Sequence, residues 1–140
     1  MGPVAAVKSC LVKFVTFSGR ASRAEYWFFF LFNVGVMVVA VFLDQLLGTG
    51  VDLDSSGSDT GLLTLIWYLV EVLPSISVSV RRLHDRNRSG WWYFFVFVPV
   101  AGPITLLIWY CMRGTSGENR FGPDPLAPSA PPSAWPIAAA

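Results

Sequence analysis

The chain is poor in charged residues, in histidine and in cysteine. Asp, Glu, Lys and Arg make up only 14% of its 140 residues, whereas hydrophobic residues make up 54%. Because a soluble domain carries about 25% charged residues, this shortage excludes an ordinary soluble domain. The two cysteines, Cys10 and Cys111, lack the spacing of metal ligands. The sequence therefore predicts neither a metal site nor a cofactor.

Charge is almost absent from three long stretches, residues 26–43, 61–80 and 91–112. The first and third contain no Asp, Glu, Lys, Arg or His, and the second contains only Glu71. At about 1.5 Å per helical residue, the third stretch would extend roughly 33 Å, which suffices for a hydrocarbon core of about 30 Å. We therefore predict an all-α integral membrane protein with three transmembrane helices.

The third stretch has an alternative interpretation. Pro99, Gly102 and Pro103 could break it into a re-entrant hairpin, which would return the chain to the side from which it came. Because broken backbone exposed to lipid is unfavourable, we favour a single span kinked by the prolines. In that topology Cys10 and Cys111 lie on opposite sides of the membrane and stay unpaired.

The ends of the chain differ from its middle. The first residues place Lys8 and Lys13 among apolar side chains, which predicts a short amphipathic helix at the membrane surface. The last residues are rich in Pro and Ala and cannot bury enough apolar area to offset their ordering entropy. We divide the chain into an interfacial segment (1–25), a three-helix transmembrane domain (26–112), a structured Gly/Pro loop (113–125) and a disordered tail (126–140).

A helix-start signal precedes the first apolar stretch. Ser22 stands three residues before Glu25, which is the spacing of a capping box. In such a box the serine oxygen accepts a backbone N–H and the glutamate reaches back to the backbone of the serine. Arg20 and Arg23 flank this signal and can reach lipid phosphates.

The segments between the apolar stretches differ in charge. Four basic residues precede the first stretch and four arginines follow the second, whereas residues 44–60 contain four aspartates and no Lys or Arg. By the positive-inside rule, the N-terminus and the 81–90 loop lie in the cytoplasm, and the 44–60 loop lies outside.

Glu71 is the one charged residue within the three stretches. A carboxyl near the middle of a membrane is costly and should face a polar partner, a water-filled cavity or another subunit. Two interpretations stay open: Glu71 handles protons or cations, or it is a structural acid that hydrogen-bonds Ser75 one turn later. Ser75 and Ser79 share a helix face and allow a neighbouring helix to approach closely.

Residues 81–92 form the most distinctive segment. Arginine is suited to bidentate phosphate contacts, and paired tryptophans mark re-entry into the membrane. We predict that this segment binds anionic lipid head groups or an acidic partner, together with Arg20 and Arg23. The binding residues predicted within it are Arg81, Arg82, His84, Asp85, Arg86, Arg88, Trp91 and Trp92.

An enzymatic interpretation would make His84 and Asp85 an acid–base pair. Adjacent helical residues point about 100° apart, so the pair does not by itself form a hydrogen-bonded dyad. The sequence also offers no Ser or Cys nucleophile with an evident base, and no Gly-rich phosphate loop. We therefore predict no enzyme and no catalytic residue.

Three ordered blocks of the sequence resemble a known family: residues 17–27 (FSGRASRAEYW), 81–92 (RRLHD with SGWW) and 114–125 (GTSGENRFGPDP). They are similar to the signature blocks of the YhaH-like small bacterial inner-membrane proteins, catalogued as domain of unknown function 805. The resemblance spans about residues 8–125 and implies a multi-pass protein of the bacterial cytoplasmic membrane. It implies no catalytic residues.

Three functions are compatible with these observations. The first is a small membrane scaffold or interaction protein that contacts anionic lipid, and this is the function we favour. The second is an oligomeric transporter or channel subunit that uses Glu71, and the third is a membrane-embedded enzyme that uses His84. The expected partners are membrane lipids, a second copy or another membrane protein, and not nucleic acid.

Overall fold

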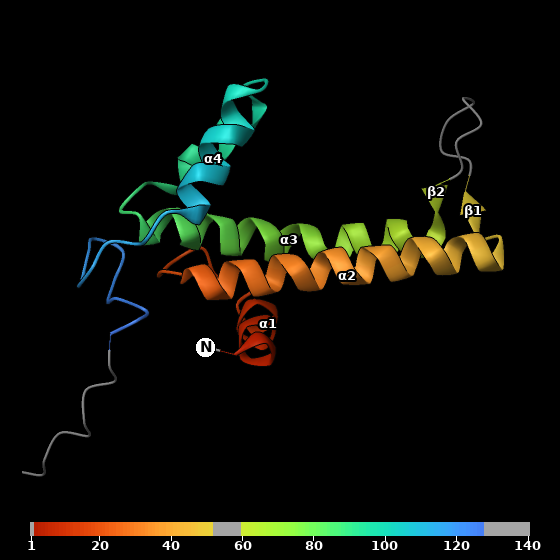
Figure 1. Cartoon of the computed structure of the whole chain (residues 1–140), viewed down its shortest axis with the longest axis horizontal. Coiled ribbons are helices and arrows are strands. Elements are labelled where there is room, and N and C mark those ends of the chain that lie inside the picture. The colour runs from red at the N-terminus through yellow and green to blue at the C-terminus, as the bar shows by residue number, and fades with distance from the viewer. Residues whose placement is uncertain (1, 52–59, 128–140) are drawn as a thin grey trace, which may run out of the picture.

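The computed structural model describes residues 2–51 and 60–127 and is mostly helical (Figure 1). Two short strands, β1 and β2, pair antiparallel. In chain order the elements are α1 (Pro3–Val12), α2 (Arg23–Leu47), β1 (Gly50–Val51), β2 (Thr60–Gly61), α3 (Leu62–Asp85), the 3₁₀ helix η1 (Gly90–Phe97) and α4 (Ala101–Cys111).

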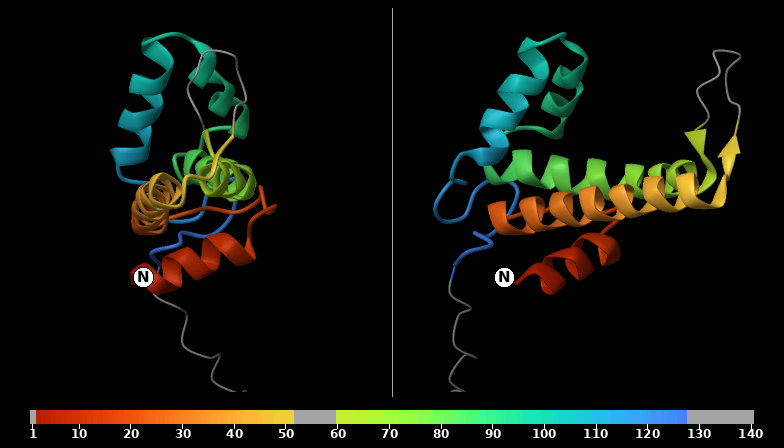
Figure 2. Two further views of the ribbon diagram at one scale, coloured as in Figure 1. Left: turned by 90° about the vertical axis from the view of Figure 1, so that its right-hand side faces the viewer. Right: turned by 45° about the vertical axis from the view of Figure 1, so that its right-hand side comes forward.

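The long antiparallel pair α2 and α3 forms the axis of the molecule (Figures 1 and 2). Among the described residues, these are the two helices long and apolar enough to cross a membrane, with 25 and 24 residues. In the most apolar 18-residue segment of each helix, only 17% (α2) and 22% (α3) is buried within the protein. Their outward surface is rich in apolar side chains, such as Val38 and Leu69, which are 64% and 66% exposed. A bilayer can cover this surface, and the protein itself does not.

Both helices extend beyond the spans that the sequence predicted. α2 begins directly after Ser22, whose Oγ accepts a hydrogen bond from the Glu25 N–H at 3.2 Å. This contact confirms the serine half of the capping box; the carboxylate of Glu25 binds elsewhere. α3 continues to Asp85, so Arg81 and Arg82 are helical residues and not loop residues.

At the opposite end of the pair, a residue of α2 caps α3. α3 begins after Gly61, which supplies no side-chain cap. The Asp44 carboxylate accepts hydrogen bonds from the backbone N–H groups of Leu63 (3.0 Å) and Thr64 (2.8 Å) instead. Asp44 is therefore a buried residue of α2 and not part of an outer loop as predicted. Its contacts tie the end of α2 to the start of α3.

The third apolar stretch is not one helix. η1 and α4 run in opposite directions as a hairpin that projects from the end of α3 (Figure 2). The turn at residues 98–100 satisfies backbone groups locally, because the Ala101 N–H donates to the Pro99 carbonyl (2.7 Å) and the Gly102 N–H donates to the Val98 carbonyl (3.0 Å). The structure therefore does not confirm a third span, and the chain turns back at Pro99 as in the alternative interpretation.

The hairpin returns the chain to the start of α2. Arg23 Nη1 donates to the Cys111 carbonyl at 3.5 Å, and the Cys10 sulfur lies 3.8 Å from Oε1 of Glu25. Both cysteines therefore lie near the same end of the helix pair, and the prediction that they lie on opposite sides is wrong. Both are free thiols.

The N-terminal helix α1 lies across α2 instead of alongside it (Figures 1 and 2). Ala6 and Cys10 are buried on its inner side, whereas Lys8 is exposed. The segment after α1 is held by Ser77 of α3, whose hydroxyl donates to the carbonyls of Lys13 (2.9 Å) and Thr16 (2.7 Å). These contacts fix α1 and the segment after it against the helix pair, and the position of α1 at a membrane surface stays a prediction.

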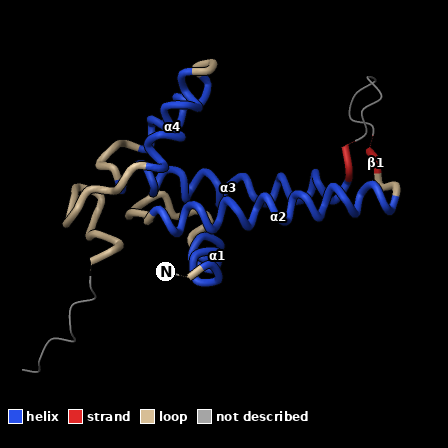
Figure 3. The backbone as a smooth tube through the Cα atoms, viewed as in Figure 1, coloured by secondary structure: helices blue, strands red, loops and turns tan. Residues whose placement is uncertain are grey.

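Two predicted segments fall mainly outside the described residues. They are the acidic part of the 44–60 loop, at residues 52–59, and the tail from residue 128 onward. The loops that are described gather mostly at one end of the molecule, where α2 begins and α3 ends (Figure 3). That end holds the candidate site.

Candidate functional site: a buried ion cluster beneath a basic surface

Three segments that are distant in sequence meet where α2 begins and α3 ends. The Ala21 N–H donates to the Arg81 carbonyl at 3.0 Å, which joins the first segment to α3. The Thr115 N–H donates to the Asp85 carbonyl at 2.8 Å, and Nδ2 of Asn119 donates to the His84 carbonyl at 3.0 Å. Residues 17–27, 81–92 and 114–125, which carry the family resemblance, therefore form one assembly.

Buried charged groups occupy the centre of this assembly, and we call them the ion cluster: Arg20, Glu25, Arg81, Arg82 and Asp85. Each of these residues is at most 8% exposed. Such groups are costly to remove from water unless opposite charges and hydrogen bonds compensate them.

The first part of the ion cluster joins α2 to α3. Nη1 of Arg81 lies 2.7 Å from Oε1 of Glu25, and the side chains are 1% and 3% exposed. Ser9 of α1 donates to the same carboxylate oxygen at 3.0 Å. Burial and the charge of Glu25 raise the pKa of the adjacent Cys10 thiol to about 12, so this thiol stays protonated and unreactive at neutral pH.

The second part joins three segments through Asp85. Nη2 of Arg20 lies 2.9 Å from Oδ1 of Asp85, and Arg82 pairs with Oδ2 of the same carboxylate. Arg82 also donates to the Tyr110 carbonyl at 3.2 Å, which fixes the end of α4. No side chain fits at Gly114, because a Cβ there would overlap the Asp85 carboxylate.

Arg20 extends the ion cluster into the Gly/Pro loop. Its Nη1 donates to the Gly117 carbonyl at 2.6 Å and its Nη2 donates to the Thr115 carbonyl at 2.5 Å. Asp124 lies 4.0 Å from the same guanidinium. Hydrogen bonds from the Leu126 and Gly117 backbone, with the charge of Arg20, hold the pKa of Asp124 below its usual range. The loop is therefore ordered around a buried cation.

His84 and Asp85 do not form an acid–base pair in this arrangement. The His84 ring stacks on Phe121 with centroids 3.9 Å apart, and its Nδ1 lies 3.1 Å from the Gly19 carbonyl. Both oxygens of the Asp85 carboxylate accept hydrogen bonds from arginines, Oδ1 from Arg20 and Oδ2 from Arg82. His84 therefore packs against Phe121, and Asp85 is the ion-pair partner of the two arginines.

The remaining residues of the predicted binding set lie nearer the surface. Arg23, Trp91 and Trp92 are exposed, and Arg86 and Arg88 are half-buried. The Arg88 guanidinium stacks over Trp109 of α4, with its carbon 3.9 Å from the ring centroid.

The structure thus divides the predicted set. Arg20, Arg81, Arg82, His84 and Asp85 are buried and committed to internal partners, so they do not present a surface to lipid. The five residues nearer the surface can do so, and lipid binding by them stays a prediction.

A second polar location lies between α2 and α3, away from the ion cluster. Glu71, Ser75 and Ser79 face one groove, and Ser75 Oγ donates to Oε2 of Glu71 at 3.5 Å, as their spacing predicted. Asn33 of α2 also lines this groove. Asn33 is not among the residues predicted from the sequence, although it is the only Asn, Gln or charged residue in the stretch 26–43.

Comparison with known proteins identifies the family. A family model described as "Protein of unknown function (DUF805)" matches residues 14–123. The chain is 43% identical over 115 residues to the inner membrane protein YhaH of Escherichia coli (strain K12), covering 82% of this chain and 91% of YhaH. It is 40% identical over 117 residues to the inner membrane protein YhaI of the same organism, covering 84% and 92%. No solved structure matches. These names give a membrane location and no activity, and the resemblance found in the sequence is confirmed: the chain belongs to the DUF805 family.

Proposed function

We propose that this integral membrane protein is a small multi-pass scaffold of the bacterial inner membrane, whose basic end contacts anionic lipid on the cytoplasmic side. The supporting observation is the position of its cations. All ten Lys and Arg residues belong to α1, the start of α2, the end of α3 or the segments that pack beside them. The positive-inside rule assigns such an end to the cytoplasm.

The cations at this end have two roles. Three arginines are buried in the ion cluster and neutralised by internal carboxylates. The cations left to face the membrane surface are Lys8, Lys13, Arg23, Arg86, Arg88, Arg113 and Arg120. Each cation near an anionic leaflet contributes about 1 kcal/mol of attraction, and the attraction fades beyond a Debye length of about 8–10 Å. In this proposal the ion cluster holds the segments of the basic end together, and the outer cations bind lipid head groups.

This proposal predicts a measurable lipid preference. Spin-labelled phosphatidylglycerol should associate with the reconstituted protein more than spin-labelled phosphatidylcholine. Changing Arg23, Arg86 and Arg88 together to Gln removes three of the seven outer cations and should clearly reduce that preference at low salt, whereas the matched change of all three to Lys should keep it. An unchanged preference in the Gln variant would contradict the proposal.

A second candidate function is a transporter or channel subunit in which Glu71 handles protons or cations. The observation that favours it is the polar groove between α2 and α3. In proteoliposomes, Glu71→Gln should abolish any cation or proton flux, and a pure scaffold should show no such flux before or after the change.

A further inference from the structure

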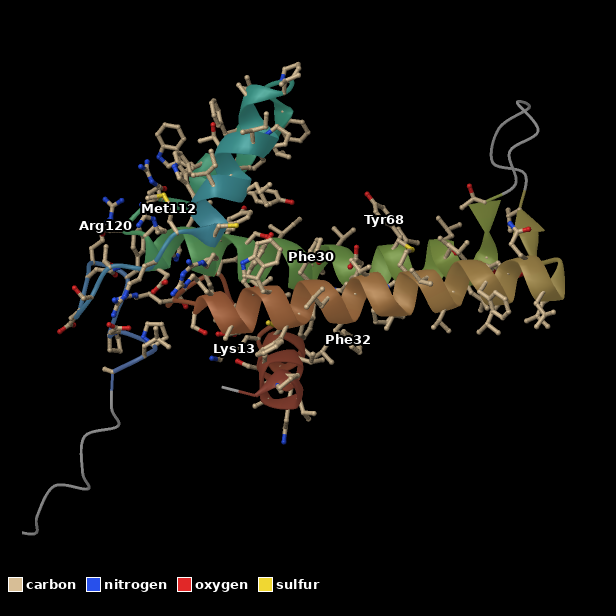
Figure 4. All side chains as sticks on the ribbon, viewed as in Figure 1. Lys13, Phe30, Phe32, Tyr68, Met112 and Arg120 are labelled. Carbon is tan, nitrogen blue, oxygen red and sulfur yellow. The ribbon has the colours of Figure 1, made fainter. Side chains whose placement is uncertain are left out.

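The groove between α2 and α3 has the size of a small-molecule site. Its volume is about 380 Å³, and pockets that bind drug-sized ligands have volumes of about 300–1,000 Å³. Phe30, labelled in Figure 4, contributes to its wall along the line where the two helices meet. The wall is mainly apolar, with a few polar groups that converge on it.

Those polar groups are rich in acceptors. Glu71 brings a carboxyl group, and Asn33 is only 8% exposed. Oδ1 of Asn33 is buried, and no donor for it lies within the described part of the chain. None of the lining residues that the structure describes is Lys, Arg or His. An unpaired buried acceptor costs about 1–3 kcal/mol, so a ligand that donates hydrogen bonds here is favoured.

If α2 and α3 cross the bilayer as proposed, the groove lies deep in the membrane. Asn33 follows the start of α2 by ten residues, which is about 15 Å along the helix, and Glu71 follows the start of α3 by nine residues, or about 14 Å. Both positions are near the middle of a hydrocarbon core of about 30 Å. Polar groups at this depth usually mark a ligand path or an internal partner.

Aromatic side chains complete the environment. Tyr26, Phe29 and Phe30 line the groove on the α2 side. The face of an aromatic ring attracts a cation, and the attraction grows when water is excluded. A carboxyl group, an unpaired carbonyl oxygen and aromatic rings share one preferred ligand, which is a cation with N–H donors and an apolar body.

We propose that this groove binds a protonated lipophilic amine from the bilayer. The ammonium group pairs with the Glu71 carboxylate and donates one N–H to Oδ1 of Asn33, while the apolar body lies against the aromatic side chains. The inference goes beyond lipid contact at the basic end, and neither depends on the other.

The test uses a matched pair of probes in nanodiscs of uncharged lipid that hold the full chain. One probe is naphthylmethylammonium and the other is its N-trimethyl analogue, which has the same ring and charge but no N–H. The amine should bind, and Glu71→Gln should weaken its binding about tenfold or more, because a charge-assisted hydrogen bond is lost. Glu118→Gln removes the same kind of group from an exposed position outside the groove and should leave binding unchanged.

Asn33→Leu supplies the second readout. The amine should bind the unaltered chain more tightly than the trimethyl analogue does, and this variant should reduce that preference. Val34→Trp, which fills the groove, should abolish binding of both probes, and circular dichroism checks that each variant is folded. Equal binding of the two probes to the unaltered chain, or binding unaffected by Glu71→Gln, would overturn the proposal. Loss of phosphatidylglycerol preference would not bear on it.

Discussion

At the scale of single residues, the ion cluster is the unusual feature of this chain. Buried arginines are stable only where carboxylates and carbonyl oxygens replace water. Here Glu25 and Asp85 supply the charges, and the backbone carbonyls of Tyr110 and Gly117 accept further N–H groups of Arg82 and Arg20. The Arg20–Asp85 and Arg81–Glu25 pairs each join segments that are distant in the chain, whereas the Arg82–Asp85 pair lies within α3.

The Arg81–Glu25 pair should therefore show strong coupling. Glu25→Met alone leaves a buried guanidinium without its partner and should cost about 3–5 kcal/mol of unfolding free energy. Arg81→Met alone should cost a similar amount for the same reason. The double variant should cost clearly less than the sum of the two, as measured by unfolding in mixed micelles with increasing dodecyl sulfate. Additive losses would show that the two side chains do not interact.

Part of this site could be predicted from the sequence. Ser22 caps α2 as its spacing from Glu25 indicated, because a cap depends on a local pattern. The partner of Glu25 could not be predicted, since Arg81 is 56 residues away and the pairing depends on how α2 packs against α3. The burial of Arg20, Arg81 and Arg82 could not be predicted either, because a basic segment beside a membrane stretch usually faces lipid.

At the scale of the elements, the hairpin of η1 and α4 shows where hydropathy misleads. Residues 91–112 are long and apolar enough for a span, and hydropathy does not distinguish one helix from two. The turn is set by Pro99 and Pro103, which lack an N–H, and by Gly102, where a Cβ would overlap the Phe95 carbonyl. These three residues are visible in the sequence. Whether they kink one helix or form a turn between two helices depends on the backbone hydrogen bonds around them, which only the structure shows.

The cap that Asp44 provides for α3 gives a prediction at this scale. Asp44→Ala removes the acceptor for two backbone N–H groups and should lower the unfolding midpoint by about 3–6 °C. The adjacent Gln45 is exposed, and Gln45→Ala should change the midpoint little. Thermal unfolding followed by circular dichroism measures both. An equal effect of the two changes would argue against the cap.

At the scale of the whole molecule, we propose that the chain crosses the membrane twice. The three segments that build the ion cluster then lie on the same side of the membrane. α2 and α3, the two described helices long and apolar enough to cross a membrane, are the two crossings in this proposal, and the hairpin brings residues 113–127 back to the basic end. This arrangement explains why the three blocks of the family resemblance occur together, since each contributes residues to the same buried contacts.

The most direct test is the accessibility of single cysteines in a chain that carries Cys10→Ala and Cys111→Ala. An impermeant maleimide added to intact cells should label Ser56→Cys and should fail to label Asn87→Cys or Ser116→Cys. Permeabilised cells should show labelling at all three. Labelling of Ser116→Cys in intact cells would mean that the chain crosses the membrane a third time, which would contradict the hairpin and the assembly of the ion cluster.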